Sequence, residues 1–409
     1  MSPSHLTEEA DSSWSIVQKI RQSPPVDLTK PYDTATLSGK SILITGGASG
    51  FGAAFARHWA RHGAHIFIGD VNDAAGEELV AELRAISPEE AEGVGRNCQH
   101  FYFHCDVTSW DDQVRLFKSA IAASPTKGID CVVAGAGIVD LSSAFDEPKR
   151  RVGADDDEPA EPKLKVVEVN LKGVMYTTHL ALYYLPKNGT RTRKRSRGSN
   201  GVEREEEEEQ GRGGGQARDR HVLLVSSIAG LLPLPSQTEY TASKHAVMGV
   251  FRSLRGTSWC RGVRVNVINP YFVETPLLTG GALALLAGAP KGQVEDVVDA
   301  ATRLVADEGI VGRALVIGPK MRVVDGEDGL PKLEVEAGAV ADAKRDEPRT
   351  QAVWEVYGHD YEKVETFVWR FITMLNAVKA TYGWVRTAKE WWRIFRGTAG
   401  RRGQDQKNK

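Results

Sequence analysis

Tyr240 and Lys244 are the two side chains of this sequence whose spacing points most directly to chemistry. They stand four residues apart in Tyr-Thr-Ala-Ser-Lys, so on a helix both side chains lie on one face. A free tyrosine has a pKa of about 10 and is a poor base at neutral pH, but a nearby ammonium group stabilises the phenolate and lowers that pKa. The spacing therefore predicts a tyrosine that exchanges a proton with a substrate oxygen, with Lys244 lowering its pKa.

Two polar residues earlier in the chain, Ser227 and Asn170, fit the same chemistry. Ser227 ends an apolar run in Val225-Ser226-Ser227, and its hydroxyl could hold a substrate oxygen while Tyr240 exchanges the proton. Asn170 lies in a helical pattern, where its amide could bind a backbone group or a relay water. Each of these residue types is common in purely structural roles, so the prediction of catalysis rests on their combination.

A glycine-rich turn follows the first apolar run of the chain. It reads Thr45, Gly46, Gly47, Ala48, Ser49, Gly50, Phe51 and Gly52. Glycines let the backbone approach a pyrophosphate, and the N-terminus of the following helix offers free N–H groups and the positive end of its dipole. Glycines also make ordinary turns, but the strand–turn–helix context predicts a dinucleotide site. The expected contact residues are Thr45, Gly46, Ser49, Gly50, Phe51 and Gly52.

Asp70 closes the second expected strand, 18 residues after Gly52. A carboxylate at this place can accept both ribose hydroxyls of an adenosine and would repel a 2′-phosphate. Neither Ala48 nor Val71 offers a basic side chain that would hold such a phosphate. The residue types therefore predict NAD rather than NADP as cofactor. The structural alternative is that Asp70 only caps the next helix.

Two later strand ends are expected at the same edge of the sheet. Asp106 and Val107 follow the third strand, where side chain and backbone could contact adenine. The fourth strand is followed by small residues, which would let the chain pass close to the cofactor. These are Ala134, Gly135, Ala136 and Gly137.

Short apolar runs that end in glycine or polar residues predict the buried parallel strands that must position these groups. They are Ser41–Thr45, His65–Gly69, Phe101–Cys105, Cys131–Ala134, Val222–Val225, Val263–Ile268 and Ala314–Ile317. Helical patterns alternate with them, among them Ala53–His62, Ala74–Ile86 and Trp110–Ala123. The alternation predicts an α/β fold, a doubly wound parallel sheet (Rossmann fold) with right-handed crossovers in a single domain.

The composition is that of an ordinary soluble globular protein. The 409 residues carry a net charge of −2 and are 41% hydrophobic, which gives no global reason to expect nucleic acid or membrane as partner. Cys98, Cys105, Cys131 and Cys260 form no CxxC pair, so we expect no metal site and a reducing compartment, the cytoplasm. The N-terminus lacks the apolar segment of a secretory signal, and Leu277–Ala289 is too short to span a bilayer.

The chain is expected to divide around the catalytic domain at residues 37–320. Residues 1–36 are a polar arm, partly disordered or packed on the surface. Residues 187–220 are low-complexity, with a basic run at Arg191–Arg197 and an acidic run at Glu205–Glu209, and predict a disordered surface insertion. The basic run could be a nuclear localisation signal, but the acidic run beside it favours a solvated loop.

Residues 321–350 read as a charged linker, 351–400 as amphipathic helices and 401–409 as a disordered tail. The helices are basic and rich in tryptophan, including Trp384 and Trp391, and such a helix can lie at a membrane interface. Packing of these apolar faces on the main domain or on a second subunit is the favoured interpretation.

The glycine turn, Asp70, Asn170, Ser227, Tyr240 and Lys244 together resemble the short-chain dehydrogenase/reductase family. The resemblance covers about Leu37 to Pro319 and includes the thirteen-residue step from Ser227 to Tyr240. It implies that Tyr240 is the acid/base, and that Lys244 binds the nicotinamide ribose and lowers the pKa of Tyr240. It also implies that Ser227 positions the carbonyl or alcohol and that Asn170 supports a proton-relay water.

The same resemblance places Pro270, Val273 and Thr275 beside the nicotinamide, with the Val273 backbone and the Thr275 hydroxyl holding the carboxamide. Two departures from the family pattern stand out. The usual Asn-Asn-Ala-Gly is replaced by the four small residues beginning at Ala134, which removes side-chain amides that brace the sheet. The usual Pro-Gly is Pro270-Tyr271, which puts bulk beside the nicotinamide or the substrate mouth.

The segment Tyr240–Ser253 is also similar to the hydroxyprostaglandin-dehydrogenase-like branch of that family. The resemblance implies NAD-linked hydride transfer to or from a secondary alcohol or ketone on a lipophilic small molecule. Leu277–Leu304 is expected to supply a lid over an apolar pocket. The alternatives are an NADP-dependent ketoreductase of the same fold and a non-catalytic NAD sensor or scaffold. The family also implies a dimer or tetramer, so a homo-oligomer is expected unless the insertion or tail blocks the interface.

Overall fold

The computed structural model describes most of the predicted catalytic domain. The described residues are 21–86, 98–140, 145, 158–188, 190–197, 203–210, 216–277, 286–325, 331–333, 349–358, 374 and 377. The predicted amphipathic helices after residue 358 and the predicted tail at 401–409 lie outside them, apart from residues 374 and 377.

The apolar runs of the sequence form one mostly parallel sheet. In spatial order its parallel strands are β10, β9, β8, β4, β1, β2 and β3. Strands buried on both faces need apolar residues at nearly every position, which explains the continuous runs. The predicted doubly wound fold is confirmed. Its strands are β1 (Ser41–Thr45), β2 (His65–Asp70), β3 (His100–His104), β4 (Cys131–Ala134), β8 (His221–Val225), β9 (Arg264–Pro270) and β10 (Ala314–Asp325).

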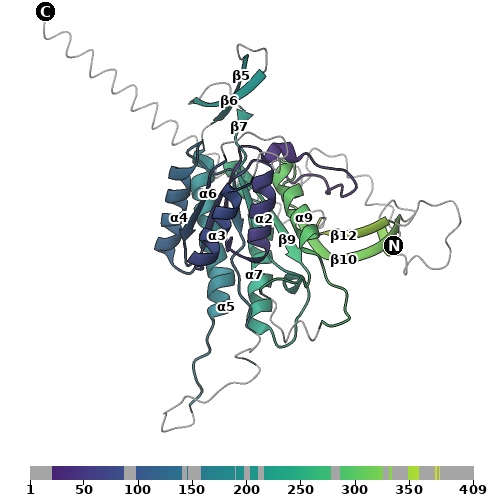
Figure 1. Cartoon of the computed structure of the whole chain (residues 1–409). Helices are drawn as coiled ribbons and strands as arrows, with labels where there is room; N and C mark the ends of the chain where they lie inside the picture. Colours follow the sequence, from purple (N-terminus) through teal and green to yellow (C-terminus); the bar gives the residue numbers. More distant parts are fainter. Residues whose placement is uncertain are drawn as a thin grey trace, which may run out of the picture. The chain divides into compact units, whose positions relative to one another are not determined.

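Helices cover both faces of this sheet (Figure 1). On one face the core is closed by α2 (Gly50–Arg61), α3 (Asp73–Arg84) and α9 (Val294–Ala306). On the other it is closed by α4 (Trp110–Ala123), α6 (Val174–Tyr184) and α7 (Thr238–Leu254). Shorter helical segments are η2 (Thr34–Leu37), α5 (Lys165–Val167), η3 (Glu168–Gly173), η4 (Leu185–Lys187), η5 (Ile228–Gly230) and η6 (Ser258–Arg261).

The described part of the N-terminal arm packs against the domain. The Val26 N–H donates to the Glu355 carboxylate at 2.8 Å, and the Tyr32 hydroxyl donates to Asp299 at 2.9 Å. Of the two states expected for the arm, residues 21–36 therefore adopt the packed one.

The expectation of a linker over residues 321–350 and helices from 351 is wrong at both ends. Strand β10 continues to Asp325 and pairs antiparallel with β11 (Pro331–Leu333) and with β12 (Arg349–Val356). Val323, Ala352 and Val353 are buried in this pairing. Polar residues alternate with the apolar ones in these strands, and the strands that pair lie far apart in the sequence. For both reasons the sequence pattern did not indicate them.

The predicted disordered insertion also contains strands. β5 (Thr190–Arg197) pairs antiparallel with β6 (Glu203–Gln210) and with β7 (Gln216–Ala217). The register sets the basic strand against the acidic one, with Arg193 opposite Glu207 and Arg195 opposite Glu205. The sequence analysis did not predict these strands, and the disorder of the insertion stays a prediction.

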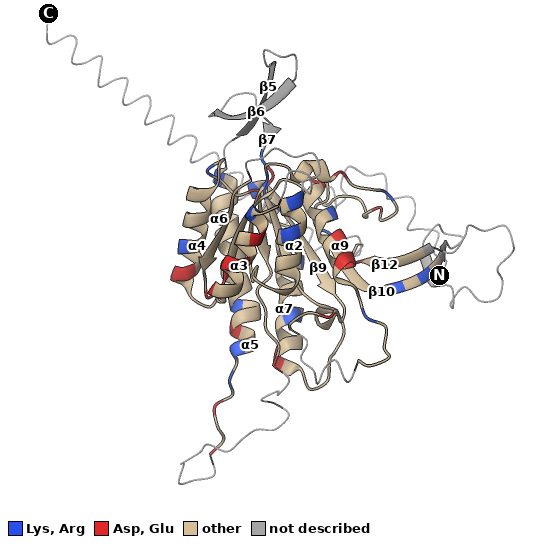
Figure 2. Ribbon diagram, viewed as in Figure 1, with Lys and Arg blue, Asp and Glu red and all other residues tan. Residues whose placement is uncertain are grey.

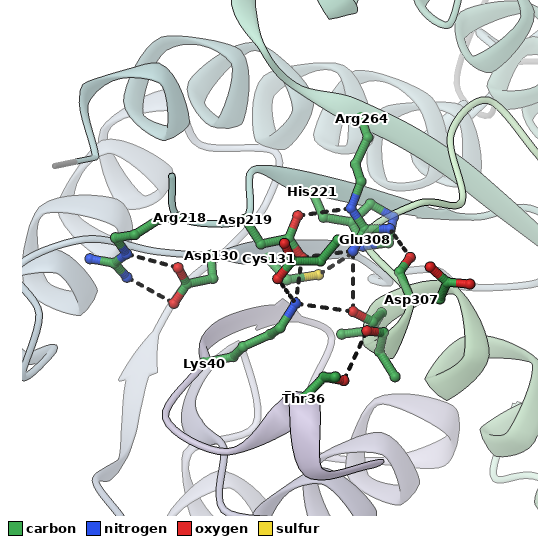
Figure 3. A network of polar contacts seen from close by, with 12 residues as sticks. Thr36, Lys40, Asp130, Cys131, Arg218, Asp219, His221, Arg264, Asp307 and Glu308 are labelled. Carbon is green, nitrogen blue, oxygen red and sulfur yellow. Dashed lines mark hydrogen bonds and ion pairs between the residues drawn. The ribbon is translucent and has the colours of Figure 1, made fainter. Parts of the chain in front are cut away.

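The insertion was also predicted to extend too far, since Arg218, Asp219 and Arg220 belong to the body of the domain. The Arg218 guanidinium donates to both carboxylate oxygens of Asp130 at 2.8 Å (Figure 3). Asp219 accepts from Lys40 at 2.7 Å, and from Arg264 at 2.8 and 2.7 Å. These groups are buried at the amino-terminal ends of the strands, the edge opposite to the strand ends that carry the glycine turn.

Burial alone would raise the pKa of Asp219, but Arg264 and Lys40 hold it below its ordinary value. Asp219 therefore stays ionised between two buried cations. Through these two ion pairs Asp219 holds the chain that follows the insertion against the starts of β1 and β9.

Because the hairpin is fastened at its base, its removal should leave the domain intact. Thr190 and Ala217 are paired neighbours, so replacing residues 191–215 by two glycines closes the gap with a short turn. We expect the melting temperature to change by only a few degrees and turnover to stay the same, as measured by thermal unfolding and steady-state kinetics. A large fall in either quantity would show that the hairpin supports the fold or the site.

Candidate active site

The carboxyl ends of the parallel strands surround a cavity of about 530 Å³. Eleven residues predicted for the cofactor line it, namely Gly46, Ser49, Gly50, Phe51, Gly52, Asp70, Asp106, Val107, Gly135, Gly137 and Thr275. Ala136, expected beside the cofactor among the small residues after β4, lines it as well. The other lining residues were not among the predicted contacts: Val71, Cys105, Ile138, Lys165, Val169, Pro276 and Leu277. Most of them are neighbours in sequence of the predicted residues, whereas Lys165 and Val169 come from α5 and η3.

The glycine turn packs so closely that side chains would not fit. Gly46 has a φ of +70°, and a Cβ there would lie 2.5 Å from the Ala136 Cα. A Cβ on Gly52 would lie 2.3 Å from the Gly46 carbonyl oxygen. Ser49 is the N-cap residue of α2, but its side chain makes no capping hydrogen bond. The first turn of α2 thus presents its N–H groups at the cavity, as anion binding at a helix N-terminus requires.

Asp70 is held as part of the cavity wall. Its carboxylate accepts hydrogen bonds from the Ala48 N–H at 3.0 Å and the Asn72 N–H at 3.1 Å. The N-cap of α3 is Asn72, whose side chain accepts from the Ala75 N–H, so Asp70 does not cap that helix. The Tyr102 hydroxyl donates to the Asp70 carbonyl at 2.8 Å and fixes the backbone at the end of β2.

Thr45 and Ala134 lie elsewhere than predicted, since both side chains are buried and neither lines the cavity. The Thr45 hydroxyl donates to the Val133 carbonyl and accepts from the Gly135 N–H, both at 3.3 Å. It therefore ties the end of β1 to the turn after β4. This tie supplies bracing at the place where the small residues after β4 provide no side-chain amides.

The four predicted catalytic residues come together beside this cavity. The Ser227 hydroxyl is hydrogen-bonded to the Tyr240 side chain. The Lys244 Nζ lies 5.6 Å from the centroid of the Tyr240 ring and donates to the Val225 carbonyl at 3.1 Å. A Cβ placed on Gly137 would lie 3.6 Å from the Lys244 Nζ and 3.5 Å from the Asn170 Oδ1. The catalytic cluster therefore adjoins the cavity at Gly137.

Asn170 uses its amide to hold a loop. Its Oδ1 accepts from the Ile138 N–H at 2.8 Å, and its Nδ2 donates to the Ile138 carbonyl at 2.9 Å. Asn170 lies in the π-helical turn η3, where the helix is locally widened. Of the two partners expected for this amide, the structure shows the backbone group.

The protonation behaviour of Tyr240 differs from the expectation. Burial raises the pKa of Tyr240, and the hydrogen bond from Ser227 opposes that rise only in part. Burial also lowers the pKa of Lys244 to about 8. The predicted lowering of the Tyr240 pKa by Lys244 is thus wrong in this structure, because burial penalises the phenolate.

Two serines that the sequence analysis did not assign hold the catalytic helix in place. The Ser226 hydroxyl donates to the Lys244 carbonyl at 3.0 Å, and the Ser243 hydroxyl donates to the Tyr240 carbonyl at 2.7 Å. Ser243 also accepts from the Asn170 amide at 3.3 Å. Their adjacency to Ser227 and Lys244 in the sequence was the signal that could have identified them.

The segment after β9 also borders the site. The Ser227 hydroxyl is 3.5 Å from the Pro270 carbonyl, which it can use as an acceptor. Val273 is buried and bridges to Gly292 through its backbone, while Thr275 lines the cavity. A Cβ on Gly50 would lie 3.9 Å from the Thr275 Cβ, so this segment reaches the glycine turn. Pro270 and Val273 themselves are not part of the cavity lining.

The site contains no obvious place for a metal. Among the described residues, no group of three or more His, Cys, Asp or Glu side chains is arranged to hold a metal ion. Within the same residues, no helix is long and apolar enough to cross a bilayer.

Comparison with known proteins agrees with this geometry. The profile of the family described as short chain dehydrogenase matches residues 40–194 and 216–281. The 5'-hydroxyaverantin dehydrogenase of Dothistroma septosporum is 36% identical over 309 residues, which cover 72% of this chain and 89% of that protein. The chain therefore belongs to the short-chain dehydrogenase/reductase family.

A second relative and one solved structure are also similar to this chain. The NADP-dependent dehydrogenase clz5 of Cochliobolus lunatus is 30% identical over 300 residues, covering 72% of this chain and 93% of that protein. A short-chain type dehydrogenase/reductase from Mycobacterium marinum superposes with a TM-score of 0.52 at 22% identity, covering 70% of this chain and 96% of that one. The superposition supports the fold.

Membership of this family implies a nicotinamide dinucleotide as cofactor, and the residues fit one. The cradle at Gly46 and Gly52 leaves no room for side chains, and the uncapped start of α2 suits a pyrophosphate. Asp70 and Gly137 line the same cavity.

Proposed function

We propose that this protein transfers a hydride between NAD and a secondary alcohol or ketone on a lipophilic small molecule, with Tyr240 as acid/base. The observation that carries the proposal is the cluster of Ser227, Tyr240, Lys244 and Asn170 at the Gly137 end of the cavity. Bound NAD supplies the acceptor for the hydride, and the chain's own residues handle the proton and the orientation of the substrate.

In alcohol oxidation the hydride leaves the carbinol carbon with its electron pair, and the hydroxyl proton passes to the Tyr240 oxygen. Ser227, already hydrogen-bonded to Tyr240, holds the substrate oxygen beside it. In ketone reduction Tyr240 returns the proton to the carbonyl oxygen. A general acid/base group placed in this way contributes about 10²- to 10⁴-fold to the rate.

Lys244 and Asn170 complete the arrangement. Lys244 lies beside Gly137, where it can hold the ribose next to the nicotinamide, and Asn170 keeps the loop at Ile138 in place. Because Lys244 is buried with a pKa of about 8, its charge is available at neutral pH. Val273 and Thr275 are assigned to the carboxamide.

The choice of NAD rests on Asp70. Its carboxylate lines the cavity at the end of β2, and the adjacent Val71 is exposed there without a charge. The carboxylate would accept the two ribose hydroxyls and repel a 2′-phosphate. The alternative of an NADP-dependent ketoreductase is favoured by the name of the Cochliobolus relative.

Exchange of the residues at this position tests the assignment. Asp70→Ala combined with Val71→Arg should weaken NAD binding and strengthen NADP binding, each by about tenfold or more, since like charge against a phosphate costs several kcal/mol. Dissociation constants from fluorescence titration measure both. Asp111→Ala, which removes an exposed carboxylate from the first turn of α4, is the matched control and should change neither. Tighter binding of NADP than NAD by the unaltered protein would refute the argument.

A lipophilic substrate is proposed because the rim of the site is apolar. Leu232 and Leu277 are exposed at 53% and 37% in the segments that follow η5 and β9. The name of the Dothistroma relative identifies it as a dehydrogenase of a hydroxylated compound, which supports an alcohol as substrate. Residues 278–285 of the expected lid lie outside the described residues. The expectation that the lid extends to Leu304 is wrong, because the residues from Val294 onward form α9, whose apolar side chains are buried in the core of the domain.

We further propose a cytoplasmic enzyme without a nucleic-acid partner. No disulfide joins Cys98, Cys105, Cys131 or Cys260, which fits a reducing compartment. Among the described residues, charges of both signs are spread over the helices in Figure 2. A homo-oligomer and a peripheral membrane contact of the tail stay predictions.

The experiment that tests the proposed function is a screen of lipophilic secondary alcohols with NAD, followed by absorbance of NADH. Sustained NADH formation with at least one of them is expected. Tight NAD binding without turnover of any alcohol or ketone would favour the non-catalytic sensor or scaffold.

A further inference from the structure

The segment that follows β9 carries two adjacent aromatic residues, Tyr271 and Phe272, directly beside the catalytic cluster. The residue before them, Pro270, presents its carbonyl to the Ser227 hydroxyl at 3.5 Å. The Tyr271 N–H donates to the Ile317 carbonyl at 2.7 Å, and the Phe272 carbonyl accepts from the Gly292 N–H at 2.9 Å. The backbone under both rings is thus fixed on two sides.

The pleat of β9 decides on which face of the sheet Tyr271 lies. Val265 and Val267 belong to the core under α4, α6 and α7, whereas Ile268 belongs to the opposite core. Side chains alternate along a strand, and the Tyr271 N–H still makes the ladder bond to β10. Tyr271 therefore continues the series of Val265 and Val267, on the side of α7 and of Tyr240.

The two rings are ordered and half-buried. Their centroids lie 4.9 Å apart at an interplanar angle of 84°, an edge-to-face pair. Leu231 packs against the same core as α7, and Leu232 next to it is exposed, both just after η5, which begins beside Ser227. A substrate bound to Ser227 and Tyr240 would therefore approach a site with an aromatic ring and apolar side chains near its entrance.

We propose that Tyr271 contacts the substrate and that the preferred substrate carries a flat aromatic ring next to its secondary alcohol. This rests on the proposed function. Rings prefer stacked or edge-to-face contact with other rings, beyond the gain from buried area. A fixed ring beside the carbinol site favours a planar neighbour over a puckered one, because the planar group can lie against it.

The test uses matched pairs of alcohols that differ only in the ring. They are 1-phenylethanol against 1-cyclohexylethanol, and a naphthyl ethanol against its fully saturated counterpart. The unaltered protein should oxidise the aromatic member of at least one pair with kcat/KM about 3- to 10-fold higher, the range expected from ring–ring contact. In Tyr271→Leu and Tyr271→Met this ratio should fall to about one. In Tyr271→Phe, which keeps a ring, it should be retained.

Tyr183→Leu is the control, because it removes an exposed ring from the end of α6 that belongs to no part of the site. The NAD dissociation constant, measured without substrate, shows that each variant still folds around its cofactor. The inference would be overturned if both Tyr271→Leu and Tyr271→Met kept the ratio of the unaltered protein. It would also be overturned if the unaltered protein oxidised aromatic and saturated alcohols at equal rates. Failure of every alcohol, aromatic and aliphatic, would instead count against the proposed function.

Discussion

Replacing Tyr240 by Phe should reduce turnover about 10²- to 10⁴-fold while NAD affinity changes little. The substitution keeps the buried ring but removes the oxygen that we propose exchanges the proton. The proposed cofactor contacts at the glycine turn, Asp70 and Lys244 are left in place. Steady-state kinetics with an oxidised alcohol and fluorescence titration with NAD measure the two quantities.

Tyr184→Phe is the matched control for this change. It makes the same alteration in a ring of α6 that stacks on Phe117 with centroids 5.6 Å apart. It should leave turnover unchanged. Turnover near that of the unaltered protein in Tyr240→Phe would show that another group moves the proton.

The pH dependence follows from the same residue. Because burial raises the pKa of Tyr240, the phenolate is scarce at neutral pH and becomes more abundant as the pH increases. Alcohol oxidation should therefore accelerate toward alkaline pH, and Tyr240→Phe should lose this rise. A rate that falls with increasing pH in the unaltered protein would contradict the assignment of Tyr240 as base.

The second large effect is expected at Asp219, on the opposite edge of the sheet. Asp219→Asn removes the negative charge between Lys40 and Arg264 and leaves two buried cations without it (Figure 3). Removing one partner from a buried ion pair lowers the free energy of unfolding by about 3–5 kcal/mol. Urea unfolding should show a loss of this size in the free energy of unfolding.

Glu308→Gln is the control, since it also contacts Lys40 but its side chain is 45% exposed. Its cost should stay below about 1 kcal/mol, as for exposed pairs. The folded-state pKa of Asp219 is lowered, so its contribution is complete above the ordinary aspartate pKa and is lost as the pH falls through the lowered one. Equal stability losses in the two variants would show that the network is not the anchor we infer.

The sheet could be predicted because the central parallel strands are buried on both faces. Ser41–Thr45 and His221–Val225 are buried at every position, and such strands require continuous apolar runs. The glycine turn could be predicted as well, since Gly46 and Gly52 are places where any Cβ would collide with the backbone. In both cases the constraint is local and leaves its mark on consecutive residues.

What could not be predicted depends on distant partners. The strand Arg349–Val356 pairs with β10, and nothing nearby in the sequence marks it. Asp219 reads as the end of a charged insertion until Lys40 and Arg264 are placed beside it. Likewise, the raised pKa of Tyr240 follows from burial in the folded protein, which the helical spacing of Tyr240 and Lys244 does not report.

The central claim is tested most directly by following the hydride itself. 1-Phenylethanol carrying deuterium at its carbinol carbon is incubated with NAD and the protein, and the NADH formed is isolated for mass spectrometry. The account predicts NADH that carries one deuterium, formed by Tyr240→Phe at a rate at least about 10²-fold lower. NADH without deuterium, or equal rates of deuterium transfer in the two proteins, would contradict it.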